Sequence, residues 1–470
     1  MTKRIIFLIA AALLVRSVPS HAQLPGPATP AAAPALPPSP LAGEGAAGGK
    51  MPASAGSSLP LTLAEAQKLA LKNNPRISEA LLNAAAALEV RSQYRAAYLP
   101  TLQGNLTGVI SDKGSRLAAG GLNNPVLYNR FAAGVSLNQM VTDFGRTSQL
   151  VDMARLKADA QNQLAEQSRQ DVLLVTGQAY FEVLRAQAVL KVARKTVAAR
   201  QYLVDQVSAL AKNNLKTELD VSFAKVNLGD AQMMLVQAEN SLKASQAQLA
   251  AVLGLPGDIL FRLAEEPLPA QLAGDPEPLI RQALRNRPEL KGRQLEEDAA
   301  QKFVQAEHAL HYPTMNVMGA AGVVPAGQKQ VDDRYGAAGF NISVPIFNGG
   351  LFKAREAEAR LKAQAARERL DDLEVRVARD VRVACLEEKT AYRKVGMSEQ
   401  LQKQAETAFD LAFSRYNLGL SSIVELSQAQ LNLTSAQLAF ASAKYEWEAK
   451  RLNVAYQTGA LTPSSPLTSS

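Results

Sequence analysis

At residues 143–145 the sequence reads Asp-Phe-Gly, and 205 positions later, at residues 348–350, it reads Asn-Gly-Gly. The two triplets belong to proline-free stretches, residues 126–255 and 346–462, which match each other at this fixed offset without insertions. Internal repeats are sought first, because a repeat that is missed leads to the wrong fold. The chain of 470 residues is therefore predicted to contain two copies of one structural unit rather than about three ordinary domains.

The two copies differ in length only upstream of the matched triplets. The strings Ala-Leu-Lys-Asn-Asn-Pro at residues 70–75 and Ala-Leu-Arg-Asn-Arg-Pro at residues 283–288 lie 213 positions apart, eight more than the later offset. Proline is tolerated in the first turn of a helix, so each string is predicted to end one short helix and start the next. Because length changes are tolerated in exposed loops, the difference predicts a surface loop between residues 313 and 348.

Apolar and polar residues alternate in both copies on either side of the expected loops. In residues 101–111, leucine, isoleucine and glycine fall on one face, whereas most of the polar residues fall on the other. Such alternation indicates β-strands. We predict one hairpin in each copy, at about residues 101–141 and about residues 314–347. Its strands of about ten residues are long enough to cross a membrane when tilted.

A very long helix is predicted after each hairpin, at residues 146–212 and 351–415, with only Gly177 and Gly396 as interruptions. About 65 residues correspond to ~100 Å at about 1.5 Å per residue. Small apolar residues recur every seven positions, as in a coiled coil. In the first copy they are Ala158, Ala165, Val172, Ala179, Ala186 and Ala193. Each long helix is expected to end in a short turn, after which a second helix runs back antiparallel.

Membrane-length strands in a four-stranded open sheet cannot stand alone in lipid. The N–H and C=O groups of the edge strands would be unpaired in hydrocarbon, so the sheet must close, which requires about eight strands or more. We therefore predict a mixed α+β membrane protein that forms a homotrimer. Its chains would together supply a 12-stranded transmembrane β-barrel in contact with lipid, continued by a long α-helical coiled-coil barrel.

The remaining segments complete the predicted domain organisation. Lys3 and Arg4, followed by an apolar run of about eleven residues and a small-residue site, indicate a cleavable secretory signal peptide. A Pro- and Ala-rich composition that buries little apolar surface indicates a disordered leader. The predicted division is a signal peptide at 1–22, a leader at 23–60, a first repeat at 61–255, a linker at 256–278, a second repeat at 279–460 and a C-terminal tail at 461–470.

Motifs and composition argue against an enzyme. The sequence contains no nucleophile elbow, phosphate-binding loop or metalloprotease motif, so no cofactor is expected. His308 and His311 are three residues apart, but two potential ligands are too few to predict a metal site. Cys385 is the single cysteine, which excludes an intramolecular disulfide. The formal net charge of +8 is spread along the helices, so no nucleic-acid partner is expected.

Two motifs resemble those of a known family. Residues 344–350, Val-Pro-Ile-Phe-Asn-Gly-Gly, look like a strand-to-helix signature, and residues 416–426, beginning Tyr-Asn-Leu-Gly-Leu, look like a periplasmic helix turn. In this duplicated layout they make residues 61–460 resemble the outer-membrane efflux and secretion channels of the TolC-like type. The resemblance implies a trimeric barrel in the outer membrane and a periplasmic tunnel of helices. It also implies an equatorial collar built from residues near 256–285, which include the linker, and from the C-terminus. Docking to a periplasmic adaptor protein and an inner-membrane transporter is implied as well.

The resemblance also implies a gate at the periplasmic end of the tunnel. Matching the second turn residue by residue places the family's acidic ring at Glu425 and Gln428. A latch between helices matches Tyr416 and Asp220, whereas Ser421 occupies the position of a further arginine link. Three copies of one carboxylate around a narrow lumen would repel each other and attract cations. The alternative interpretation is an ordinary solvated charge at a helix end.

Two further groups of residues follow from the same match. The helix tips that would dock the adaptor are Asn214, Leu215, Lys216, Thr217, Gly419, Leu420, Ser421 and Ser422. The residues of the strand-to-helix transition are Asp143, Gly145, Pro345, Phe347, Gly349 and Gly350. For the tips, ordinary turn chemistry is the alternative, since glycine often ends a helix and serine or threonine often caps the next one.

The predicted function is that of a passive exit duct in the outer membrane, which conducts substrates from an inner-membrane transporter and a periplasmic adaptor to the exterior. The duct would serve a tripartite efflux system or a type I secretion system. The alternative is a periplasmic coiled-coil scaffold or adaptor protein without a pore. The alternating segments favour the duct. Each is long enough to cross a membrane and has one apolar face, which a soluble scaffold does not need.

Overall fold

The computed structural model describes residues 61–112, 129–256, 261–265, 275–327, 329 and 332–462. All of them belong to one compact unit, Leu59–Ser470. The predicted signal peptide, the predicted leader, most of the 256–278 linker and residues 463–470 of the predicted tail lie outside the described residues.

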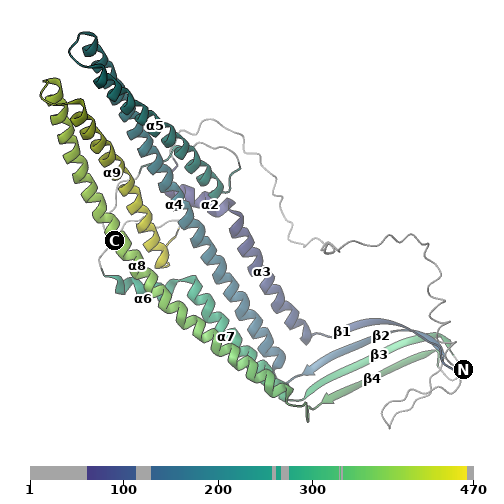
Figure 1. Cartoon of the computed structure of the whole chain (residues 1–470). Helices are drawn as coiled ribbons and strands as arrows, with labels where there is room; N and C mark the ends of the chain where they lie inside the picture. The colour runs from purple at the N-terminus through teal and green to yellow at the C-terminus, as the bar shows by residue number, and fades with distance from the viewer. Residues whose placement is uncertain are drawn as a thin grey trace, which may run out of the picture. The chain divides into compact units, whose positions relative to one another are not determined.

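The described chain contains two series of elements in the same order (Figure 1). The first series is α2 (Leu63–Asn73), α3 (Pro75–Arg95), β1 (Thr101–Val109), β2 (Arg130–Thr142), α4 (Arg146–Lys212) and α5 (Glu218–Val252). The second is α6 (Pro276–Asn286), α7 (Pro288–His308), β3 (Thr314–Gly327), β4 (Arg334–Ser343), α8 (Leu351–Asn417) and α9 (Ile423–Gln457). Single 3₁₀ turns, η1 (Ala96–Tyr98) and η2 (Ala309–His311), precede β1 and β3. Corresponding helices have equal lengths of 11, 21, 67 and 35 residues.

Local sequence explains where the short helices begin. Thr62 and Glu65 form a capping box at the start of α2. The side chain of Asn74 accepts a hydrogen bond from the backbone of Arg76, and Pro75 follows as the first residue of α3. Pro288 opens α7 in the same way, because the first helical residue needs no N–H partner. α6 begins at Pro276, three residues before the predicted start of the second repeat.

The four strands form one antiparallel sheet in the order β1-β2-β3-β4, so the hairpins of the two series lie next to each other. The second hairpin is shorter than predicted, because β4 ends at Ser343 and the prediction extended it to residue 347. Pro345 provides the physical reason, since its nitrogen carries no hydrogen to donate to the ladder. The connection between β3 and β4, residues 328–333, falls within the interval 313–348 in which a surface loop was predicted from the length difference.

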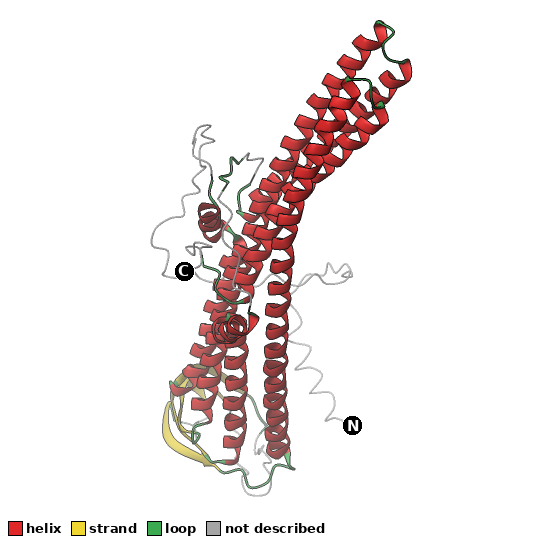
Figure 2. Ribbon diagram, turned by 90° about the vertical axis from the view of Figure 1, so that its left-hand side faces the viewer, coloured by secondary structure: helices red, strands yellow, loops and turns green. Residues whose placement is uncertain are grey.

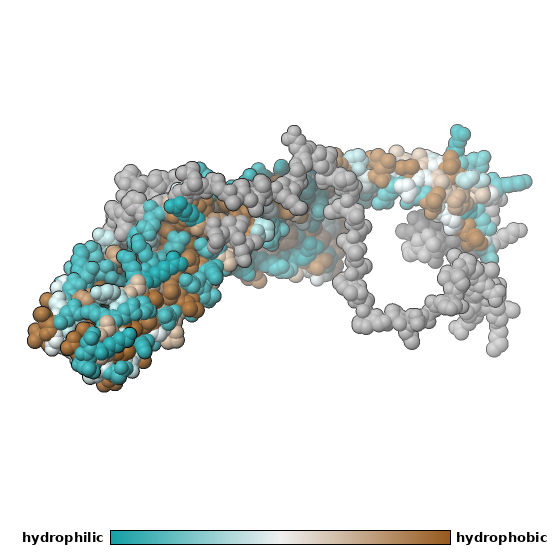
Figure 3. All heavy atoms as spheres, turned by 90° about the horizontal axis from the view of Figure 1, so that it is seen from above, coloured by the Kyte–Doolittle hydropathy of each residue, from teal (hydrophilic) through white to brown (hydrophobic). Residues whose placement is uncertain are grey.

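The sheet has one apolar and one polar face, because paired residues and every second residue along a strand share a face. The apolar face carries Leu102, Leu106, Phe131, Val135, Leu137, Val317, Val323, Phe340 and Ile342, all of them more than a third exposed. The polar face carries Gln103, Asn105, Thr107, Ser136, Asn138, Asn341 and Ser343. Figure 3 shows hydrophobic side chains exposed along the sheet and at the helix tips.

Four helices pack side by side next to the sheet, in the order α3, α4, α7 and α8. Farther from the sheet, α4 pairs with α5 and α8 with α9, and each pair ends in a turn at the far end of the helices (Figures 1 and 2). None of the described helices is both long and apolar enough to span a membrane.

The largest buried cluster surrounds the middle of α4. Tyr180 is 1% exposed, and its hydroxyl oxygen lies 3.0 Å from the carbonyl oxygen of Leu61 and 2.7 Å from that of Ala264. From α9, the hydroxyl of Tyr445 donates a hydrogen bond of 2.8 Å to Glu265. The described part of the linker, residues 261–265, is therefore fixed against the helices at their mid-length.

Candidate functional site

The helix tips consist of two short turns, one after α4 and one after α8. Asn214 and Gly419 have positive φ angles of 56° and 73°, which let the chain leave each helix and reverse. Thr217 then caps α5 and Ser422 caps α9, each accepting a hydrogen bond from the backbone N–H three residues later. The eight predicted docking residues all lie in these two turns or at the caps that follow them.

The predicted latch residues lie close together without a hydrogen bond between them. The Asp220 carboxylate completes a capping box, accepting hydrogen bonds from the backbone N–H of Thr217 at 3.0 Å and from its hydroxyl at 2.8 Å. Tyr416 is 1% exposed, and its hydroxyl has no hydrogen-bond partner in the described part of the chain. Burial, with a further contribution from the negative charge of Asp220, raises the pKa of Tyr416 to about 12.

Instead, Tyr416 contacts the other tip through Lys216, whose ammonium nitrogen lies 3.9 Å from the centroid of the ring. This cation–π contact joins the α4–α5 hairpin to the α8–α9 hairpin. Two hydrogen bonds reinforce the junction, both between side chains far apart in sequence: Gln206 to Asn417 at 3.0 Å and Asn227 to Ser427 at 2.9 Å.

An apolar cluster lies between the same two hairpins. It combines buried residues of the first hairpin, Leu203, Val207 and Val221, with buried residues of the second, Ala412, Tyr416, Ile423 and Leu426. The two hairpins are therefore held together at the tips by packing as well as by polar contacts. Sequence reasoning placed Lys216 among the docking residues and did not identify this junction.

Glu425 lies in the first turn of α9 and faces a cation that the sequence match missed. The nearest guanidinium nitrogen of Arg415, in the last turn of α8, is 3.5 Å from its carboxylate, and both side chains are about half exposed. Arg415 thus supplies a positive charge near the turn, although Ser421 occupies the position at which an arginine was expected. Gln428 donates a hydrogen bond of 3.0 Å to Asn432, one turn along the same helix.

The strand-to-helix transition is built similarly after β2 and after β4. Asp143 is 7% exposed, and its carboxylate accepts hydrogen bonds from the backbone N–H of Gly145 at 3.2 Å and of Thr147 at 2.7 Å. The positive φ angles of 97° at Gly145 and 85° at Gly350 turn the chain into α4 and α8. Gly349 also has a positive φ, of 63°.

Aromatic side chains are exposed beside this transition. Phe144 is 57% exposed and Phe347 is 89% exposed. The ring of Phe144 lies 6.2 Å from that of Tyr312, two residues before the start of β3. Aromatic residues are enriched where a membrane meets water, and Phe347, Phe144 and Tyr312 all lie at the same end of the sheet.

A buried carboxylate links three helices close to the strand-to-helix transitions. The Glu307 side chain of α7 is 2% exposed and accepts hydrogen bonds of 2.7 and 3.1 Å from two guanidinium nitrogens of Arg355 in α8. Arg146, the first residue of α4, lies 4.0 Å away. No sequence motif indicated this cluster, because its members are distant along the chain.

The histidine pair is close to an acidic side chain. His308 lies 3.2 Å and His311 lies 3.7 Å from the Glu356 carboxylate. Among the described residues, however, no group of three or more His, Cys, Asp or Glu side chains is arranged to hold a metal ion.

Several known proteins are similar to this chain in sequence or in fold. The chain is 25% identical to the outer membrane protein TolC of Salmonella enteritidis over 85% of its own length and 83% of that protein. It is also 25% identical to the alkaline protease secretion protein AprF of Pseudomonas aeruginosa, over 85% of each chain. The solved structure of the outer-membrane channel OprN matches with a TM-score of 0.73 at 20% identity, covering 85% of this chain and 90% of that one.

The sequence model that describes outer membrane efflux proteins matches in two segments, residues 66–255 and 279–460. These segments contain most of both series of helices and strands, the two turns at the tips and both strand-to-helix transitions. The chain belongs to the outer membrane efflux protein family.

Proposed function

We propose that three copies of this chain form an outer-membrane duct, through which an inner-membrane transporter and a periplasmic adaptor expel substrates to the exterior. The single observation that carries the proposal is the open four-stranded sheet with an exposed apolar face. β1 and β4 each have one unpaired edge, and in lipid those edges must pair. Pairing β4 of one copy with β1 of the next closes a barrel, and three copies supply twelve strands.

The helices support the same assembly. The equal lengths of corresponding helices allow both hairpins to reach the same level, as two structural repeats of one unit would. When the sheets of three copies join edge to edge, their three four-helix layers also come to lie side by side. They then form a ring of twelve helices that continues the barrel. Residues 261–265 then lie at the equator of the helical part, as the family resemblance implies.

The gate of the duct lies at the tips. Opening requires the two hairpins of each copy to separate, which breaks the contact of Lys216 with Tyr416 and the hydrogen bonds made by Gln206 and Asn227. Glu425 adds three carboxylates to the aperture of the trimer, each partly neutralised by its neighbour Arg415. Asp220 acts in this gate as the cap of α5 and as a negative charge near Tyr416.

The adaptor docks on the apolar side chains that the two turns expose. Leu215, Leu418 and Leu420 are 68%, 73% and 66% exposed, and large apolar side chains at the ends of helices are suited to a protein partner. The inner-membrane transporter supplies the energy. Efflux of small molecules and secretion of proteins both fit a duct of this architecture, since the chain is similar both to the toluene efflux pump outer membrane protein TtgF of Pseudomonas putida and to the alkaline protease secretion protein AprF.

Membrane fractionation with gel electrophoresis tests the proposal against the scaffold alternative. We expect the full chain in the outer-membrane fraction, as a trimer that migrates as one band without heating and as a monomer after boiling. Release of a monomer by osmotic shock would contradict the duct and favour a soluble scaffold.

A further inference from the structure

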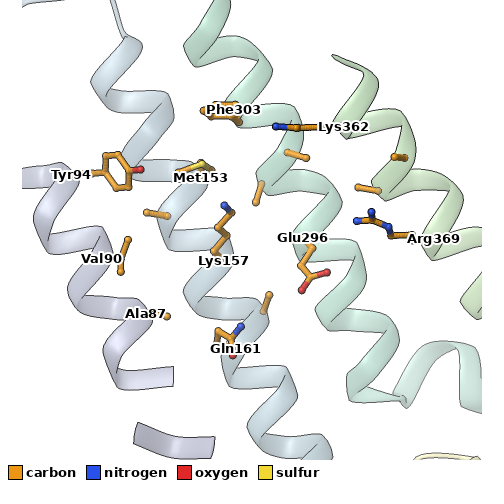
Figure 4. A pocket seen from close by; sticks show the side chains of 16 residues that line it. Ala87, Val90, Tyr94, Met153, Lys157, Gln161, Glu296, Phe303, Lys362 and Arg369 are labelled. Atoms are coloured by element: carbon orange, nitrogen blue, oxygen red, sulfur yellow. The ribbon is translucent and has the colours of Figure 1, made fainter. Parts of the chain in front are cut away.

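A groove of about 770 Å³ lies on one face of the four-helix layer, and all four helices line it (Figure 4). α3 contributes Val90 and Tyr94, α4 contributes Met153, and α7 contributes Phe303, which together form an apolar wall. Because α3 and α8 are the outer members of the layer and both reach the groove, the layer curves toward it. This face is therefore the concave one.

The groove also carries an excess of positive charge. Lys157, Lys362 and Arg369 line it, whereas Glu296 is the single acidic side chain among its lining residues. Lys362 is paired with Glu358 at 2.6 Å, and Glu296 is paired with Arg293 at 2.7 Å. Those four charges compensate each other.

Lys157 and Arg369 are exposed, and neither makes an ion pair within the described residues. Among the residues that line the groove, Lys157 and Arg369 therefore carry the positive charges that no ion pair compensates. In Figure 4 both side chains lie at the groove together with the aromatic rings of Tyr94 and Phe303.

A second groove, on another face of α7 and α8, shows that this excess is a local feature. Its arginines, Arg360 and Arg367, are both paired with carboxylates: Arg360 with Glu356, and Arg367 with Glu297 at 3.5 Å and with Asp371 at 3.1 Å. Both arginines of the second groove are thus neutralised by carboxylates, whereas two cations of the concave groove are not. Arg367 thus provides a matched control position.

We propose that the concave groove is a binding site for amphipathic organic anions, such as aromatic sulfonates or carboxylates. The apolar body of such a solute fits against Tyr94, Met153 and Phe303, and its acidic group pairs with Lys157 of α4 or with Arg369 of α8. The inference rests on the proposed duct, because closing the ring of helices turns each concave face toward the lumen. The trimer then presents three such sites to its cargo, and charged rings of this kind bias the passage of ions.

Single-channel recording in planar bilayers, with 1-naphthalenesulfonate as the probe, tests this inference. We expect the probe to reduce the current of the natural channel, and the double variant Lys157→Gln/Arg369→Gln to need about tenfold more probe for the same reduction. The Arg367→Gln variant should behave like the natural channel. Uncharged 1-naphthylmethanol should act equally on all three, since it lacks the acidic group.

The outcomes separate the two proposals. If the natural channel and the double variant are equally sensitive to 1-naphthalenesulfonate and both give normal conductance steps, the proposed binding site is wrong. The proposed function as a duct would still stand. An equal loss of sensitivity in Arg367→Gln and in the double variant would also contradict the proposed binding site. It would show that the probe responds to the net charge of the channel rather than to the cations of this groove. If the natural protein gives no conductance steps, the proposed function as a duct is wrong, and so is a binding site in its lumen.

Discussion

Single residues in the long helices have different roles even where they are chemically identical. Gly177 and Gly396 both interrupt a helix of 67 residues. At Gly177 an added Cβ would clash with the side chain of Leu452 in α9, whereas at Gly396 nothing lies within 4 Å. Gly177 is therefore needed for the close approach of α9 to α4, and Gly396 has no such packing role in the described structure.

Alanine substitutions should separate these two roles. We expect Gly177→Ala to destabilise the protein by about 1–3 kcal/mol, because overpacking forces α4 and α9 apart. Gly396→Ala should stabilise it by about 0.5–1 kcal/mol through the higher helix propensity of alanine. Thermal unfolding of each variant, followed by circular dichroism in detergent, measures both effects. Equal effects of the two substitutions would contradict the packing at Gly177.

Tyr416 should make the tips sensitive to alkaline pH. Its pKa is raised from 10.0 to about 12 by burial and by Asp220, so the folded state favours the neutral phenol. The resulting stability is fully present below pH 10 and is lost as the pH rises from about 10 to about 12, by about 1 kcal/mol per pH unit. Denaturation midpoints between pH 9 and pH 12 measure this loss.

The Tyr416→Phe variant is the control for the pH dependence. It should show a smaller loss of stability over the same interval, since it has no phenol to ionise at this position. At neutral pH the substitution should change stability by less than about 1 kcal/mol, because the buried hydroxyl has no hydrogen-bond partner among the described residues. A large destabilisation at neutral pH would instead support a direct latch to Asp220.

Local sequence predicts residues of the turns and caps better than it predicts their partners. The positions of Gly145, Gly350 and Gly419 follow from backbone conformations that glycine adopts readily, and the structure gives all three a positive φ. Partners such as Arg415 for Glu425 were missed, because the chain reversal between them decides which side chains meet. A single sequence carries no signal for such pairs.

At the scale of elements, the junction between sheet and helices depends on one buried carboxylate. Glu307 of α7 binds Arg355 of α8 and lies near Arg146 of α4, just where the two long helices begin. Removing its charge would leave two guanidinium groups without their anion, although both can reach solvent. The three helices would lose their polar connection at the end that adjoins the sheet.

We expect Glu307→Gln to destabilise the protein by about 3 kcal/mol, the lower end of the values for broken buried pairs, because both guanidinium groups can reach solvent. The matched control is Glu399→Gln, which removes the exposed pair with Lys403 at 2.8 Å and should cost less than about 0.5 kcal/mol. Chemical denaturation of both variants provides the comparison. Similar costs for the two would show that the Glu307 cluster does not hold the junction.

The predicted helices and strands differ from the observed ones mainly at their ends. The first long helix has the predicted limits, and the second extends two residues beyond its predicted end, to Asn417. Periodicity over many turns makes long helices easy to predict. β4 ends four residues early because Pro345 stops the ladder, whereas the alternation of apolar residues continues past it and misled the prediction.

At the scale of the whole molecule, the charge at the aperture should control conduction. We expect Glu425→Ala to raise single-channel conductance, because three carboxylates would leave the aperture of the proposed trimer. Block by divalent cations should need about tenfold more cation, which corresponds to a loss of about 1.4 kcal/mol of binding free energy. Planar-bilayer recordings with added Mg²⁺ measure both quantities.

Gln428→Ala is the control for this prediction, since it shortens a neutral side chain one turn away on the same helix. It should leave divalent block unchanged. Unchanged conductance and block in Glu425→Ala would remove Glu425 from the gate and favour the interpretation of a solvated charge paired with Arg415.

The proposed assembly rests on the sheet rather than on any single residue. A chain with four strands, an apolar face and two unpaired edges needs neighbours, and the helices that continue from the strands must then form a ring. Single-channel recording of the full chain, purified from outer membranes and added to a planar bilayer, tests this claim most directly. The account predicts discrete conductance steps of uniform size. A folded, helical protein that produces no steps would contradict it.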